Sequence, residues 1–143
     1  MGEEYEKLVE ILTVATDDNF ILDSSRSYFD CTNYYFEIDK DSTLQKRGPS
    51  KENRRDPIVG MGLLLDAQML PVGMKIFPGN ESEKSVMRDL IHDLKSRNNI
   101  KGRTVQIADK GLNCAKNSIE AIDNGDGYLF SKSVKTLPER ERQ

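Results

Sequence analysis

Residues 58–65 are the segment that most constrains how this chain can fold. The segment reads IVGMGLLL, so it is apolar at odd and even positions alike. Successive side chains of a strand point to opposite faces, and a strand with two apolar faces is typical of the covered middle of a sheet. The chain is therefore expected to build a sheet around this segment, with other elements packed over it.

Four further strands are expected from β-branched, aromatic or alternating patterns, at residues 27–38, 70–77, 103–108 and 127–131. Apolar residues at helical spacing predict three helices, at 3–13, 80–98 and 113–125. We expect residues 16–19 to end the first helix, and Asn80 and Asn113 to be the N-caps of the other two. In the last helix, Ile119 and Ile122 are expected to face the core.

The order strand, strand, strand, helix, strand, helix, strand indicates an α/β fold of the ribonuclease H-like type. Three consecutive strands favour an antiparallel meander, and each later helix can supply the right-handed crossover that a parallel neighbour needs. The prediction is a mixed five-stranded sheet. We expect residues 1–24 to be a helical lead-in, 25–132 the ribonuclease H-like core and 133–143 a charged tail or the start of a following segment.

Composition narrows the function classes. The chain has 143 residues with 21 Lys and Arg against 24 Asp and Glu, a net charge of -3, so it lacks the basic character of many nucleic-acid-binding proteins. No apolar run approaches the ~20 residues of a membrane span, and the acidic start is unlike a signal peptide. Cys31 and Cys114 lie far apart and fit free thiols. We expect a cytoplasmic protein.

Two carboxylates stand out by position. Asp30 lies in the middle of an aromatic strand, where it would lose hydration unless a cation or hydrogen-bond donors compensate, and Asp109 ends an apolar strand. If these strands are parallel neighbours, both side chains converge across about 5 Å and form a shared Mg²⁺ or Mn²⁺ site. Two such ions can promote phosphodiester cleavage. The simpler alternative is a hydrogen-bonded strand residue at Asp30 and a turn or helix cap at Asp109.

Five sequence blocks, in order, resemble the catalytic domain of bacterial cut-and-paste insertion-sequence transposases of the DDE class. The blocks are YFDCTNYYFE at 28–37, SKENRRDP at 50–57, GMKIFPGN at 73–80, IADKGLN at 107–113 and GYLFSK at 127–132. The resemblance implies that Asp30 and Asp109 are the two metal-binding aspartates of the catalytic triad. It also implies cleavage and strand transfer of double-stranded DNA at the ends of an element, with further contacts to target DNA, and we expect a dimer in the DNA complex.

The third carboxylate of that family, a Glu in a helix signature with Tyr, Arg and Lys, has no counterpart here. Glu139 and Glu141 follow the last expected strand, but their surroundings fit a solvated tail. We therefore expect a transposase fragment that is inactive alone. The alternatives are a DNA-binding remnant without chemistry, or another ribonuclease H-like nuclease.

The connection between the first two strands concentrates positive charge. Residues 45–55 hold five cations against the single acid Glu52. These cations are Lys46, Arg47, Lys51, Arg54 and Arg55. A connection this long tends to be functional or disordered, and with almost no apolar anchor we expect it to be mobile, exposed and able to contact DNA phosphates. The alternative is a solvated loop that only aids solubility.

Replacing Arg54 and Arg55 by Ala in the full-length protein should weaken DNA binding for all sequences alike. Each lost phosphate contact removes about 0.9 from the slope of log K against log salt, so the slope should flatten by about 2. Binding titrations over a range of salt concentrations measure this slope. An unchanged slope would mean that the loop does not touch the DNA backbone.

Overall fold

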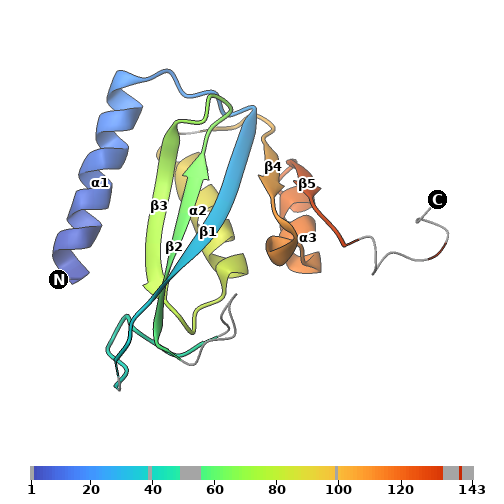
Figure 1. Cartoon of the computed structure of the whole chain (residues 1–143). Helices are drawn as coiled ribbons and strands as arrows, with labels where there is room; N and C mark the ends of the chain where they lie inside the picture. Colours follow the sequence, from blue (N-terminus) through green and yellow to red (C-terminus); the bar gives the residue numbers. More distant parts are fainter. Residues whose placement is uncertain (1, 39, 49–55, 99, 134–138, 140–143) are drawn as a thin grey trace.

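A five-stranded mixed sheet forms the centre of the molecule (Figure 1). The computed structural model describes residues 2–38, 40–48, 56–98, 100–133 and 139. The strands are β1 (Arg26–Tyr35), β2 (Ile58–Leu65), β3 (Pro71–Pro78), β4 (Val105–Ala108) and β5 (Gly127–Phe130), in the order β3-β2-β1-β4-β5. β1, β2 and β3 are antiparallel, whereas β4 is parallel to β1 and β5 is parallel to β4. The predicted ribonuclease H-like sheet is confirmed.

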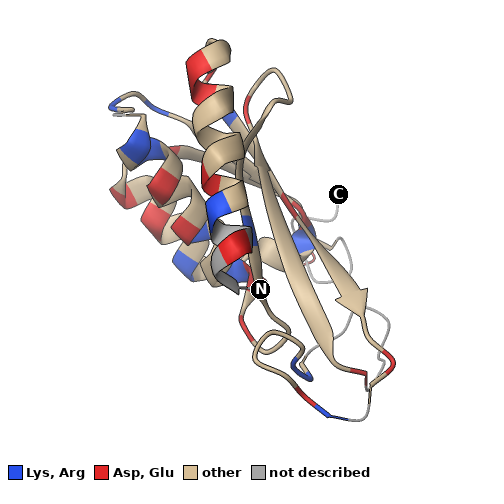
Figure 2. Ribbon diagram, turned by 90° about the vertical axis from the view of Figure 1, so that its left-hand side faces the viewer, with Lys and Arg blue, Asp and Glu red and all other residues tan. Residues whose placement is uncertain are grey.

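Helices cover one face of the sheet and flank one edge. The helical elements are α1 (Gly2–Asn19), α2 (Glu83–Arg97), the short 3₁₀ helix η1 (Lys110–Leu112) and α3 (Ala115–Asp123). α2 connects β3 to β4 and α3 connects β4 to β5, and the side chain of Arg88 on α2 reaches Asn117 on α3. α1 runs alongside β3 (Figures 1 and 2). The opposite face of β1, β4 and β5 is therefore free of helices in the described part of the chain.

The core lies between the sheet and α2. One face of β2 is fully buried and the other is half-buried, so the two-sided cover predicted for this strand is complete on one side only. Gly60 lies on the buried face. A glycine is required there because a Cβ would come within 2.3 Å of the Phe77 ring. The buried apolar side chains are Phe29, Cys31, Leu64, Val72, Phe77, Val86, Met87, Leu90, Ile91, Leu94, Ala108 and Leu112.

α3 packs in an orientation that differs from the prediction. Ile119 and Ile122 were expected in the core, but they are 56% and 59% exposed, and the buried residues are Asn117 and Ala121. The Asn117 amide donates to the Leu112 carbonyl and accepts from Arg88, so polar contacts with η1 and α2 fix the helix. Apolar spacing alone could not reveal this preference for a hydrogen-bonded face.

The helix ends also differ from the prediction. α1 continues through residues 16–19, where the Thr16 hydroxyl donates to the Leu12 carbonyl and Asp17 pairs with Arg97 of α2 at 2.7 Å. Side-chain contacts of this kind offset the weak helix propensity of the segment. The N-caps are Ser82 and Cys114 instead of Asn80 and Asn113, and neither forms a side-chain capping hydrogen bond. α2 ends at Arg97 and has Asn98 as its C-cap, which agrees with the predicted end at residue 98.

A buried carboxylate joins α2, β4 and β5. Asp126, just before β5, pairs with Lys95 of α2 and accepts hydrogen bonds from the backbone N–H of Thr104 and the side chain of Gln106. Its side chain is fully buried, whereas that of Lys95 is 18% exposed. A buried charge is tolerated when hydrogen bonds surround it, so this network aligns the two parallel strands.

Replacing Asp126 by Ala should destabilise the protein by about 3 kcal/mol, because the substitution leaves a mostly buried ammonium and two donors without their acceptor. Urea unfolding followed by circular dichroism measures the change. Asp123→Ala removes an exposed carboxylate from the same region and should leave the midpoint where it is. Equal midpoints for the two variants would contradict the structural role of Asp126.

Candidate active site

The two predicted carboxylates lie side by side on neighbouring parallel strands, with Asp30 in the middle of β1 and Asp109 directly after the end of β4. In the β1–β4 ladder Phe29 pairs with Ala108, so Asp30 and Asp109 are the residues that follow this pair in the two segments. Adjacent strands are about 4.8 Å apart, which allows both carboxylates to reach one point. The predicted pairing of these strands is confirmed.

Both side chains project from the face of the sheet opposite α2. Phe29 and Ala108 are buried toward the helices, and Asp30 and Asp109 follow them with the opposite orientation because the backbone of Asp109 remains extended. Asp30 and Asp109 line a groove of about 560 Å³ on this face. Its other lining residues are Tyr28, Phe29, Leu63, Leu65, Met69, Ile107 and Ala108.

The environment of Asp30 differs from the one expected. Its position among aromatic residues predicted a desolvated carboxylate, but the residue is exposed. Its neighbours Phe29 and Cys31 point to the opposite, buried face, so the aromatic sequence around Asp30 does not bury it. One carboxylate oxygen, Oδ1, accepts from the backbone N–H of Cys31 at 2.8 Å. The open groove, and not desolvation, is therefore what makes this carboxylate available.

Asp109 is held at the start of η1. Its Oδ1 accepts from the backbone N–H of Leu112 at 3.3 Å, as the simpler interpretation of a helix cap anticipated. Gly111 leaves room for the carboxylate, because a Cβ at that position would be 3.3 Å from Oδ1. Within the described residues no donor is bonded to Oδ2 of either aspartate, which leaves an oxygen on each for a ligand.

One positioning contact was missed by the sequence analysis. The Asn113 side chain donates to the Ser131 carbonyl at 3.1 Å, and the Ser131 N–H donates to the Ala108 carbonyl. These bonds tie the turn after Asp109 to the chain that leaves β5. The sequence pattern predicts only a helix cap at Asn113. Ser131 is 18 residues away in the chain, so no local pattern indicates the contact between the two residues.

The structure describes only the first part of the basic connection. Lys51, Arg54 and Arg55 lie outside the described residues. Lys46 is half-buried and forms a two-hydrogen-bond bridge with Ile58, and Arg47 pairs with Asp41 at 2.8 Å. The expectation of a mobile, exposed connection is therefore wrong for Lys46, because its backbone is bridged to Ile58 at the start of β2.

The carboxylates match the ligand chemistry of Mg²⁺ and Mn²⁺, which bind oxygen donors. No group of three or more His, Cys, Asp or Glu residues in the described ranges could hold a metal ion, so Asp30 and Asp109 supply two ligands only. Neither Cys31 nor Cys114 forms a disulfide, as predicted. In the same described ranges, no helix has the length and apolar character to cross a membrane.

Comparisons with known proteins found structural similarity only. No protein-family model matches the chain, and no curated protein matches it either. Among solved structures it is similar to a Mos1 transposase paired-end complex with the left transposon end, with a TM-score of 0.49 and 12% identity. It is also similar to a Mos1 mariner paired-end complex with Mn, with a TM-score of 0.49 and 15% identity, and to a pre-cleavage Mos1 transpososome, at 0.46 and 11%.

The matches cover 85% of this chain and 39–40% of the Mos1 chains, so the chain spans about two fifths of their length. Similarity at this level identifies neither an activity nor a substrate for the chain. The functional argument therefore depends on the residues of the groove.

A single divalent ion shared by both aspartates should be detectable with Mn²⁺. We expect paramagnetic broadening of the amide signals of Cys31 and Lys110 together, and weak affinity because two carboxylates leave most of the coordination shell to water. Asp30→Ala and Asp109→Ala should each abolish the broadening of both amide signals, whereas Asp18→Ala on α1, which is not a lining residue of the groove, should abolish neither. Broadening on one strand alone would show that the carboxylates do not share an ion.

Proposed function

We propose that this chain is the catalytic-domain part of a DDE transposase of the bacterial insertion-sequence type. It would cut double-stranded DNA at the ends of its element and join them to target DNA, acting as a dimer on the DNA. The observation that carries the proposal is the meeting of Asp30 and Asp109 on one face of two parallel strands, at the positions where the resembling sequence blocks place the metal-binding aspartates.

Asp30 and Asp109 would hold the metal through their free Oδ2 oxygens. A bound Mg²⁺ or Mn²⁺ supplies an activated water and stabilises the leaving oxygen of a phosphodiester. The protein contributes position: the Leu112 N–H orients Asp109, and the Cys31 N–H orients Asp30. Leu63 and Ile107 form an apolar wall beside the carboxylates, which limits the access of bulk water to that side of the groove.

Two carboxylates position one metal ion better than they position two, and in-line displacement uses two metal ions. The 143-residue chain alone should therefore bind DNA and metal without appreciable hydrolysis. Glu139 is exposed and no described contact brings it to the groove, while Glu141 lies outside the described residues. A third carboxylate from elsewhere would complete the site.

Among the residues that the structure describes, no third carboxylate joins Asp30 and Asp109, which favours a second candidate, a DNA-binding remnant without chemistry. The two candidates differ in one property that does not require hydrolysis. A catalytic-domain part places a metal ion next to bound DNA, whereas a remnant binds DNA without localising an ion.

Iron-directed cleavage tests this difference. With Fe²⁺ in place of Mg²⁺, ascorbate and peroxide generate hydroxyl radicals that break DNA close to the bound ion. The wild-type chain should raise strand breakage of a bound duplex above the level given by free iron. Asp30→Asn and Asp109→Asn should each return breakage to that level, because the neutral amide removes a metal ligand.

Asp18→Asn is the matched control, because it removes one exposed carboxylate that does not line the groove and should retain the breakage. With Mn²⁺ and no peroxide the same duplex should remain intact. Breakage that persists in both groove variants would refute the assignment of the metal site. If the wild-type chain hydrolyses DNA strongly with Mn²⁺ and Asp30→Ala loses this activity, the claim that the site is incomplete would be refuted.

A further inference from the structure

Three lysines gather beside the candidate active site, on its β5 side. In the β4–β5 ladder Phe130 pairs with Ala108, and Lys132 and Lys110 each follow this pair by two residues. The bonds of Ser131 to Ala108 and Asn113 continue the pairing beyond the end of the strand. Lys110 directly follows Asp109, which lines the groove, and Lys132 follows Ser131, which is bonded to the turn after Asp109.

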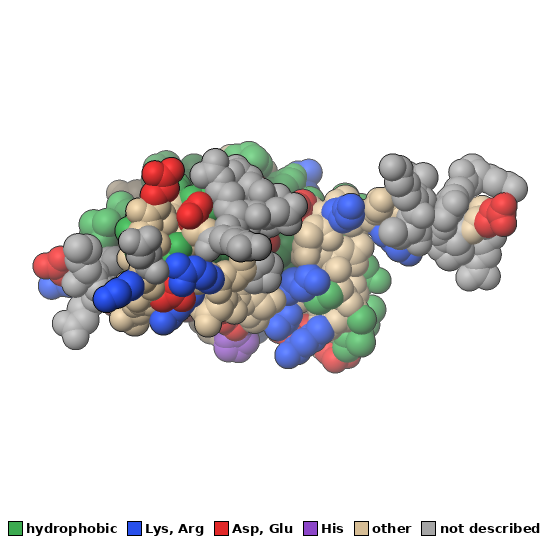
Figure 3. Space-filling view, turned by 60° about the horizontal axis from the view of Figure 1, so that its bottom comes forward, with side chains coloured by type: hydrophobic (Ala, Val, Ile, Leu, Met, Phe, Trp, Pro, Cys, Tyr) green, Lys and Arg blue, Asp and Glu red, His purple; other side chains and the backbone are tan. Residues whose placement is uncertain are grey.

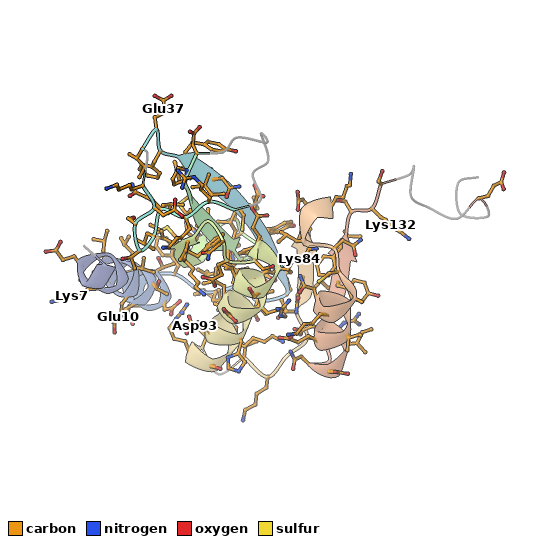
Figure 4. The ribbon with its side chains drawn as sticks, turned by 90° about the horizontal axis from the view of Figure 1, so that it is seen from below. Lys7, Glu10, Glu37, Lys84, Asp93 and Lys132 are labelled. Atoms are coloured by element: carbon orange, nitrogen blue, oxygen red, sulfur yellow. The ribbon has the colours of Figure 1, made fainter. Side chains whose placement is uncertain are left out.

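Lys116 belongs to the same surface. It lies in the first turn of α3, and Asn113, one residue before the N-cap Cys114, is bonded to the Ser131 carbonyl next to Lys132. We call Lys110, Lys116 and Lys132 the cationic rim. All three residues are exposed. Figure 4 views the molecule from this end and labels Lys132 beyond β5.

The fold leaves the cationic rim without neutralising partners among the described residues. Glu120 follows Lys116 by one helical turn, but it pairs with Arg88 of α2 at 3.4 Å. The carboxylate of Asp109 is turned to the Leu112 N–H and the groove. By contrast, the cations that pack between elements are paired, with Lys75, Lys95 and Arg97 each bonded to a carboxylate.

Charges on both sides of the groove suit an extended polyanion. β1 and β4 are parallel, so Lys46 and Arg47, in the described part of the connection after β1, lie at the same end of the sheet as the cationic rim after β4 and β5. Figure 3 shows Lys and Arg side chains on both the left and the right of this end. Small-molecule sites are concave and mostly apolar, whereas exposed lysines around an open groove match the repeated phosphates of a nucleic acid.

We propose that the cationic rim binds backbone phosphates of duplex DNA on the β5 side of the bond to be cut. This inference rests on the proposed function, because it takes DNA as the substrate of the Asp30–Asp109 groove. Lysine ammonium groups act as point charges, so the rim holds and orients the duplex without reading its sequence. It thereby fixes the direction in which the duplex crosses the groove.

The test measures the salt dependence of duplex binding in EDTA, by fluorescence anisotropy, with the 143-residue chain. In the triple variant Lys110→Ala, Lys116→Ala, Lys132→Ala, binding should weaken and the log-log slope should fall by up to about 2.7, at about 0.9 for each phosphate contact. The matched control is the triple variant Lys7→Ala, Lys101→Ala, Arg103→Ala. It removes the same charge from exposed residues on α1 and in the segment just before β4, which are not part of the cationic rim, so its slope should stay near that of the wild type.

An unchanged slope in the rim variant, or an equal fall in the control, would overturn the inference. Lys132→Ala alone, outside any helix or strand, should lower the slope by about 0.9 and keeps the test decisive if the triple variant does not fold. Iron-directed breakage separates this proposal from the proposed function. If the slope falls in the rim variant while wild-type iron breakage does not exceed that of free iron, the rim binds DNA but the metal site is refuted.

Discussion

The parallel pairing of β1 with β4 is the constraint on which the rest of the structure depends. The paired residues lie far apart in the chain, with β2, β3 and α2 between them. A parallel pair needs a crossover, and α2 supplies it while burying its apolar stripe on the sheet. The pairing then brings Asp30 beside Asp109, and β5 extends the sheet by the same rule. The groove, the turn at η1 and the cationic rim all follow from this one alignment.

Much of the fold could be predicted from the sequence, because periodicity reports which side chains a sheet or helix buries. The two-sided apolar segment at 58–65 became β2, and the stripe of α2 is buried as expected. The neighbouring positions of Asp30 and Asp109 followed from strand order alone. Their metal-binding role remains a prediction, as do the DNA contacts of Lys51, Arg54 and Arg55.

Other features depend on tertiary contacts that no local pattern encodes. Asn117 is buried because η1 and α2 offer it hydrogen-bond partners, and the two isoleucines of α3 point outward as a consequence. α1 is longer than predicted because Asp17 meets Arg97, 80 residues away. The exposure of Asp30 depends on which face of β1 the helices cover, and alternation alone does not identify that face.

The outward isoleucines of α3 have a consequence for how the chain behaves in concentrated solution. Ile119 and Ile122 lie on the helix that precedes β5, and Leu129 of this edge strand is 63% exposed. An edge strand presents backbone N–H and C=O groups that can pair with another chain, and apolar side chains beside it favour such pairing. The short length of β5, four residues, limits the number of hydrogen bonds that two copies could exchange. Contact between two copies at this edge would therefore depend more on the exposed apolar side chains of α3 and β5 than on backbone hydrogen bonds.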